Sequence, residues 1–129
     1  MSNTETQYPK SPFQNRIKLF LDGADRDSMI QFYREKKVSG FTTNPSLMRK
    51  AGVTEYEKYC RDLLKEIPDS PISFEVFADD IAEMKRQALI IKTWGTNVYV
   101  KIPVCNTKGQ FTTELVRELS HQGVKLNVT

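Results

Sequence analysis

The stretch VYVKIPV (residues 98–104) places one lysine, Lys101, inside an apolar run that predicts a β-strand. Lysine is seldom fully buried, because removing its ammonium group from water costs free energy. For this stretch alone, two interpretations are open. The Lys101 side chain either reaches solvent past its apolar neighbours, or it presents an amine inside an apolar site. The neighbouring strands decide between the two.

Strand-like runs alternate with helix-like runs from about residue 16 onward. The expected strands are 17–22, 38–43, 71–78, 97–103 and 124–129. The segments between them carry apolar residues at helical spacing, and the last expected helix covers about residues 112–121. Strands that alternate with helices predict right-handed βαβ units and a parallel sheet.

The helix starts are marked by residues that can cap free backbone N–H groups. The cap signals are Asp25 or Asp27, Asn44 followed by Pro45, the pair Thr54 and Glu57, and the pair Asp80 and Glu83. Gly95 is expected to close the helix that starts after Asp80.

Side-chain parity along the strands distinguishes between the two kinds of parallel sheet. One face is entirely apolar: Ile17, Leu19, Leu21, Ile72, Phe74, Val76, Val98, Val100, Ile102, Val124, Leu126 and Val128. The opposite face carries Asp22, Glu75, Lys101, Asn127 and Thr129, mixed with Phe20, Ser73, Phe77 and Tyr99. Helices on one face and polar residues on the other predict an α/β fold of the (β/α)8 TIM-barrel type.

Only about the first five strands of such a barrel are present in this chain. A complete barrel needs eight strands and about 250 residues, whereas the chain has 129. We therefore expect residues 16–129 to form the N-terminal part of a barrel that is truncated in its fifth strand. Residues 1–15 are polar, contain two prolines, and are expected to form a flexible lead-in.

The composition argues against several classes of protein. A net charge of +3 and scattered basic residues give no indication of nucleic-acid binding. We find neither a secretory signal nor an apolar run long enough to span a membrane, so the expected location is the cytoplasm. Cys60 and Cys105 lack metal-ligand spacing, so no metal site is expected.

Three inner-face residues can carry catalytic chemistry. An unprotonated Lys101 amine can form a Schiff base with a carbonyl, and apolar surroundings disfavour its charged form. Asp22 can act as a general base, or it can simply begin the turn that follows its strand. Glu75 lies in mid-strand and can hold a water or pair with Lys101, or form a purely structural ion pair.

The remaining polar candidates have structural alternatives as well. Asn44 can bind a substrate hydroxyl or carbonyl, and it is equally an N-cap before Pro45. Asn127 and Thr129 can contact substrate or merely solvate a strand end. Thr42 and Thr43 are expected to serve strand and turn packing.

Five blocks of the chain together closely resemble the transaldolase family. They are LFLDGAD, SGFTTNPSLMRKAG, ISFEVFA, NVYVKIPV and GVKLNVT, and the resemblance covers about residues 16–129. That family consists of class I (Schiff-base) aldolase-type barrels and includes the fructose-6-phosphate aldolases. By this resemblance Lys101 corresponds to the Schiff-base lysine, Asp22 to the aspartate that moves protons at the substrate hydroxyl, and Asn44 to a residue that positions dihydroxyacetone.

The resemblance also gives roles to the other inner-face residues. Asn127 and Thr129 correspond to substrate-contacting positions on the fifth strand. Glu75 corresponds to the glutamate that holds the catalytic water in transaldolases proper, where fructose-6-phosphate aldolases carry a glutamine. The loop VCNTKGQ (residues 104–110) departs from the usual family pattern. The serine and arginine that bind the sugar phosphate come from later strands, so no phosphate site is assigned.

The function implied is transfer of a dihydroxyacetone unit between sugar phosphates in the pentose phosphate pathway, with no metal or organic cofactor. An aldolase that releases free dihydroxyacetone is an alternative. A non-catalytic partial barrel, stable as a homo-oligomer, is another. The expected partners are small sugar phosphates, without nucleic acid or membrane.

Overall fold

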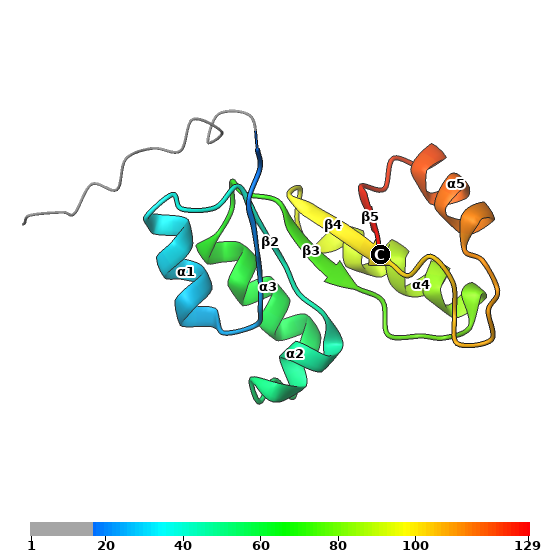
Figure 1. The fold of residues 1–129 in the computed structure, drawn as a ribbon, viewed down its shortest axis with the longest axis horizontal. Coiled ribbons are helices and arrows are strands. Elements are labelled where there is room, and N and C mark those ends of the chain that lie inside the picture. Colours follow the sequence, from blue (N-terminus) through cyan, green and yellow to red (C-terminus); the bar gives the residue numbers. More distant parts are fainter. Residues whose placement is uncertain (1–16) are drawn as a thin grey trace, which may run out of the picture.

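The computed structural model describes residues 17–129 and contains one five-stranded parallel sheet with helices between its strands (Figure 1). The strands are β1 (Phe20–Asp22), β2 (Gly40–Thr42), β3 (Ile72–Glu75), β4 (Val98–Ile102) and β5 (Leu126–Val128). They pair in sequence order, and each pair is parallel. This confirms the predicted α/β fold and is the arrangement of consecutive strands in a TIM-barrel wall. The expected lead-in at residues 1–15 lies outside the described residues.

Helices fill every connection between strands (Figure 1). They are α1 (Arg26–Arg34), α2 (Pro45–Lys50), α3 (Tyr56–Glu66), α4 (Ile81–Ile91) followed by the 3-10 turn η1 (Lys92–Trp94), and α5 (Thr113–His121). The connection from β2 to β3 carries two helices, of which the short α2 lies beyond the C-terminal end of β2.

Three of the predicted helix caps are present. Asp25 accepts a hydrogen bond from the Ser28 N–H at 3.2 Å, and Asp80 accepts one from the Glu83 N–H at 3.0 Å. Asn44 Oδ1 accepts from the Leu47 N–H at 2.9 Å, with proline at the first helical position. Each cap satisfies a donor that the first helical turn leaves without a partner.

The predicted capping box at Thr54 and Glu57 is wrong. Helix α3 has Glu55 at its N-cap position and no side-chain cap. The Glu57 carboxylate instead accepts a hydrogen bond from Arg61 Nε at 2.8 Å, one turn along the helix. An i,i+4 ion pair thus uses the group that the capping box required.

Gly95 follows helix α4 as predicted, but in a different conformation from a left-handed cap. The backbone passes through η1 and leaves it extended at Gly95, where φ is −176°. A Cβ at this position would lie 3.3 Å from a methyl carbon of Leu64. Close packing against α3 therefore favours glycine here.

The core lies between the sheet and its helices, on the face that parity predicted to be apolar. Phe74, Val100 and Ile102 are fully buried there and contribute to one cluster that includes Leu63 of α3 and Leu119 of α5. Burial of this kind stabilises a fold by about 1.5–3 kcal/mol for each large side chain.

The two ends of the sheet depart from that prediction. Ile17 and Leu19 are more than half exposed, and Val128 is 48% exposed. Strands β1 and β5 each pair on one side only within residues 17–129. The edge positions therefore lack the neighbouring strand that would help to cover them.

Candidate active site

The polar inner-face residues lie side by side because the strand register aligns them. The two rows of register partners are Asp22–Thr42–Ser73–Tyr99 and Glu75–Lys101–Asn127. Successive residues of a strand alternate between faces, so these residues share the side opposite the helices. The register thus gathers all of the strand-borne candidates except Thr129 into two adjacent rows.

Lys101 points across the inner face of the sheet. Its neighbours Val100 and Ile102 are fully buried on the other side, whereas Lys101 itself is half-buried. Lys101 Nζ donates a hydrogen bond to Thr42 Oγ1 at 3.1 Å. Because β3 lies between β2 and β4, the lysine side chain reaches over β3. Of the two interpretations of VYVKIPV, this geometry fits the amine presented inside the sheet.

Glu75 is the half-buried neighbour of Lys101 on β3. Burial raises the pKa of its carboxyl above the ordinary value, and the positive charge of Lys101 acts in the opposite direction. The Glu75 carbonyl oxygen accepts a hydrogen bond from the Tyr56 hydroxyl at 3.0 Å. Helix α3 therefore fixes the backbone of β3 at the residue that carries the carboxylate.

Asn127 lies on the other side of Lys101, on β5. It is half-buried, and its Nδ2 donates to Ser73 Oγ at 3.1 Å. This contact also reaches across an intervening strand, from β5 to β3. The carboxamide is thus held against the inner face beside Lys101.

The other three candidates lie at the C-terminal ends of strands. Asp22 ends β1 and is exposed, and Thr129 is exposed directly after β5. Asn44 is half-buried and caps α2 through its carbonyl oxygen, which leaves its amide N–H groups as donors. Asn44 is therefore an N-cap, as its structural alternative predicted, and its amide N–H groups can still donate to a ligand.

From the sequence, Thr42 was expected to serve packing only, and Ser73 was placed on the inner face without a role. Thr43 is fully buried and bonds the Ser73 carbonyl, as packing predicts. Thr42, by contrast, is the partner of Lys101. The available signal was strand parity, because Thr42 lies two residues before Asn44 and faces the same side as Asp22.

A hollow of about 540 Å³ opens at the C-terminal ends of β2, β3 and β4. We call it the C-terminal hollow; its lining includes Asn44, Arg49, Glu75, Asp79, Cys105 and Thr107. A second hollow of about 640 Å³ lies over the inner face of the sheet, and its lining includes Thr42, Ser73, Tyr99 and Asn127. Thr42, the hydrogen-bond partner of Lys101, lines the second hollow, and Glu75, its register partner, lines the first. Both spaces are large enough for small ligands.

The loop that departs from the usual family pattern forms one wall of the C-terminal hollow. Asn106 organises it by donating to the Asp79 carbonyl at 3.2 Å and accepting from the Gln110 N–H at 2.9 Å. The Asp79 carboxylate accepts from both the N–H and the hydroxyl of Thr107, at 2.8 and 2.7 Å. These bonds hold the pKa of Asp79 below its usual range.

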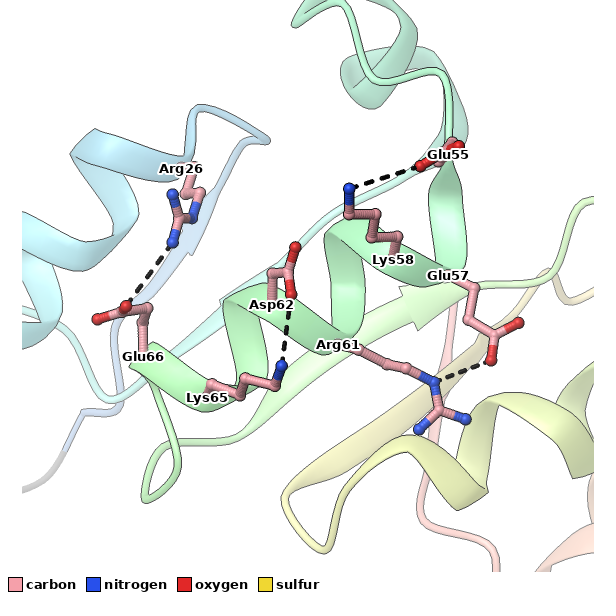
Figure 2. Close-up of polar contacts among 8 residues, drawn as sticks. All are labelled: Arg26, Glu55, Glu57, Lys58, Arg61, Asp62, Lys65 and Glu66. Carbon is pink, nitrogen blue, oxygen red and sulfur yellow. Dashed lines mark hydrogen bonds and ion pairs between the residues drawn. The ribbon is translucent and has the colours of Figure 1, made fainter.

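A third hollow, along helix α3, is a solvated surface. Figure 2 shows the charged side chains along this helix paired with one another or with α1. The pairs drawn are Glu55–Lys58, Glu57–Arg61, Asp62–Lys65 and Arg26–Glu66. Exposed pairs of this kind contribute little to stability and leave no charge that a ligand must satisfy. This surface therefore offers no candidate active-site residue.

Two absences complete the description of residues 17–129. No group of three His, Cys, Asp or Glu side chains in this part of the chain could hold a metal ion. No helix in the same range is long and apolar enough to cross a bilayer.

Comparisons with known proteins agree on one family. A model of the family "Transaldolase/Fructose-6-phosphate aldolase" matches residues 19–129. A protein of Dehalococcoides mccartyi named "Probable transaldolase" is 36% identical over 113 residues, which are 88% of this chain and 50% of the relative. A protein of Methanococcus maripaludis with the same name is 40% identical over 116 residues, again 88% of this chain and 50% of the relative. The chain spans about half the length of these curated relatives.

Proposed function

Because this chain belongs to the transaldolase/fructose-6-phosphate aldolase family, we propose that its protein transfers a dihydroxyacetone unit between sugar phosphates through a Schiff base on Lys101. The observation that carries the proposal is the Lys101 amine, which is held over the inner face by Thr42 at 3.1 Å. An amine fixed beside a ligand-sized space can attack a carbonyl bound there.

In the proposed reaction, Lys101 attacks the C2 carbonyl of a ketose phosphate and water leaves as the imine forms. The protonated imine withdraws electrons, so the C3–C4 bond breaks once Asp22 takes the proton of the C4 hydroxyl. The aldose phosphate departs, and the three-carbon unit stays on Lys101. That unit then attacks the aldehyde of an acceptor aldose, and hydrolysis of the new imine returns the lysine.

The other residues take supporting roles in this proposal. Glu75 holds the water that forms and hydrolyses the imine, and its half-buried position beside Lys101 suits that task. Asn44 and Asn127 offer amide donors to the hydroxyl and carbonyl groups of the substrate, and Thr129 contacts it at the end of β5. The protonated imine withdraws the electrons itself, so the scheme assigns no step to a metal or organic cofactor. We place the reaction in the cytoplasm.

Borohydride trapping tests the nucleophile. Purified protein reduced in the presence of fructose 6-phosphate should carry a stable mass adduct on the peptide that contains Lys101. Lys125→Ala is the matched control, because Lys125 is an exposed lysine near the start of β5 that bonds the Thr96 carbonyl. The adduct should persist in Lys125→Ala and vanish in Lys101→Ala. An adduct that survives in Lys101→Ala would refute the assignment.

An acceptor assay distinguishes transfer from simple cleavage. A transaldolase needs an acceptor aldose for turnover, whereas an aldolase releases free dihydroxyacetone. With Glu75 in place we expect acceptor-dependent turnover, and Glu75→Gln should increase the release of free dihydroxyacetone. Equal release by both proteins would contradict the role given to Glu75.

A further inference from the structure

Two tyrosines of helix α3 bond the backbone at the ends of two different strands. The Tyr56 hydroxyl donates to the Glu75 carbonyl at 3.0 Å, and the Tyr59 hydroxyl donates to the Ala24 carbonyl. Glu75 is the last residue of β3, and Ala24 lies two residues after Asp22, the last residue of β1. Residues three positions apart share one face of a helix. One face of α3 therefore contacts both strand ends that carry the candidate carboxylates.

The peptide group that follows Glu75 is held on both sides. Its carbonyl oxygen accepts from Tyr56, and its N–H, which belongs to Val76, donates to the Lys101 carbonyl at 3.2 Å. The Tyr56 ring also packs edge-on against Phe77, with the ring centroids 4.3 Å apart. A rotation of this peptide group, which would turn the Glu75 side chain, breaks at least one of these contacts.

The turn that follows Asp22 is held in a similar way. The Gly23 N–H donates to the Thr42 carbonyl at 3.0 Å, and the next carbonyl, that of the buried Ala24, accepts from Tyr59. Strand pairing before Asp22 and these two bonds after it fix the backbone from which its carboxylate extends.

Both tyrosine hydroxyls stay protonated and can therefore donate at physiological pH. Burial raises the pKa of Tyr59 to about 12, and it raises the pKa of Tyr56 well above its ordinary value. A phenolate could accept a hydrogen bond but could not donate one to a carbonyl oxygen. The two bonds to the strand ends therefore persist wherever the enzyme would work.

We propose that Tyr56 and Tyr59 are positioning residues, which hold Glu75 and Asp22 respectively in their working geometry from a single helix. The inference rests on the proposed function for the roles of the two carboxylates. Those roles belong to different steps, because Glu75 serves imine formation and Asp22 serves cleavage of the C3–C4 bond. A hydroxyl that only satisfied a buried carbonyl would affect stability without affecting one step more than the other.

Borohydride trapping in the full-length protein separates the two steps. With fructose 6-phosphate, the rate of total adduct formation on Lys101 reports imine formation, and the ratio of three-carbon to six-carbon adduct reports cleavage. Tyr56→Phe should slow total adduct formation about fivefold with the ratio unchanged, the effect of one lost hydrogen bond between uncharged groups. Tyr59→Phe should lower the ratio about fivefold with total adduct formation unchanged, for the same reason. Phenylalanine keeps the ring and its packing in both variants.

Tyr33→Phe is the matched control. It removes the same hydroxyl from a tyrosine that bonds the Asp69 carboxylate at 3.1 Å, three residues before β3 begins and so at the opposite end of the sheet. Neither quantity should change in this control. Equal effects of Tyr56→Phe and Tyr59→Phe on both quantities, or no effect of either variant, would overturn the inference.

Amide hydrogen exchange needs no imine chemistry and separates this inference from the proposed function. Tyr56→Phe should speed exchange of the Val76 N–H about fivefold, and Tyr59→Phe should do the same for the Gly23 N–H. If the wild-type protein forms no adduct on Lys101, the proposed function is refuted, and these two changes would still support α3 as the anchor of both strand ends. Unchanged exchange at both amides would overturn the inference even where the adduct forms.

Discussion

Replacement of Thr42 by valine is expected to slow imine formation on Lys101 about tenfold with little loss of stability. Thr42 Oγ1 accepts a hydrogen bond from Lys101 Nζ at 3.1 Å. Valine keeps the branched shape and the strand preference of threonine, and it removes only the acceptor. The variant therefore isolates the contact that orients the amine.

The magnitude follows from the burial of the lysine. The amine reacts in its uncharged form, and a hydrogen bond between uncharged groups contributes about 0.5–1.5 kcal/mol. Lys101 is half-buried, and a hydrogen bond is stronger away from bulk water, so the upper figure, about 1.5 kcal/mol, applies. Since about 1.4 kcal/mol corresponds to a factor of ten, the reactive orientation falls to about one tenth of its population.

The assay is the rate at which the borohydride-trapped adduct accumulates on the Lys101 peptide at a fixed concentration of fructose 6-phosphate. Thr42→Ser is the control, because it keeps the hydroxyl and loses the branching methyl group. We expect Thr42→Ser to react within about twofold of the wild-type rate. Its free energy of unfolding, measured by urea titration, should be lower by up to about 1 kcal/mol. A Thr42→Val protein that reacts at the wild-type rate, or equal slowing by both variants, would refute the reasoning.

Two further predictions concern stability. Asn97 Nδ2 donates to the carbonyls of Ile67 and Ser70 at 2.8 and 2.7 Å. At about 1 kcal/mol per bond, Asn97→Ala should lower the free energy of unfolding by about 2 kcal/mol in urea titrations. A loss below about 0.5 kcal/mol would contradict this. Burial raises the pKa of Glu75 above 4.5, although the positive charge of Lys101 acts to lower it. Above pH 4.5 the native state therefore binds more protons than the unfolded state. The free energy of unfolding of the wild type accordingly falls as pH rises through the raised pKa. The glutamine of Glu75→Gln does not titrate. The free energy of unfolding of Glu75→Gln minus that of the wild type should therefore increase between pH 4 and pH 7 in the same assay. A decrease in this difference would show that the pKa of Glu75 is lowered.

The parallel fold could be predicted from the sequence because local signals and strand parity agree. The caps at Asp25, Asn44 and Asp80 depend on short-range geometry that a few residues determine. The capping box at Thr54 failed because the Glu57 carboxylate had a second possible partner, Arg61, one turn away. Sequence spacing cannot rank two local partners of one carboxylate.

The contacts within the candidate site could not be predicted in the same way. The hydrogen bond from Lys101 to Thr42 joins residues that are 59 positions apart, and the bond from Asn127 to Ser73 spans 54. Both depend on register between strands, which is set by packing of the whole sheet rather than by any local pattern. Parity predicts the face on which each residue lies, but it does not predict the partner.

Those two bonds also indicate the shape of the sheet. Each joins strands that are separated by a third, which in a flat sheet lie roughly 9–10 Å apart. Each is also offset, because the later residue is two positions further along than the register partner of the earlier one. Side chains as short as Asn127 and Ser73 can meet over that span only if the sheet is concave on this face.

An offset of two residues for every two strands is one residue per strand, which is the shear of 8 that closes an eight-stranded TIM barrel. Applied to the register, this stagger puts Asp22, Glu75 and Thr129 in one layer, with Thr42 and Lys101 in the layer below. The layers are separated by roughly one residue along the strand, about 3 Å. In the proposed reaction, a substrate that enters from the C-terminal ends of the strands would therefore reach the two carboxylates before the amine. That order suits a reaction in which Asp22 and Glu75 handle protons and water above a carbonyl that Lys101 attacks from below.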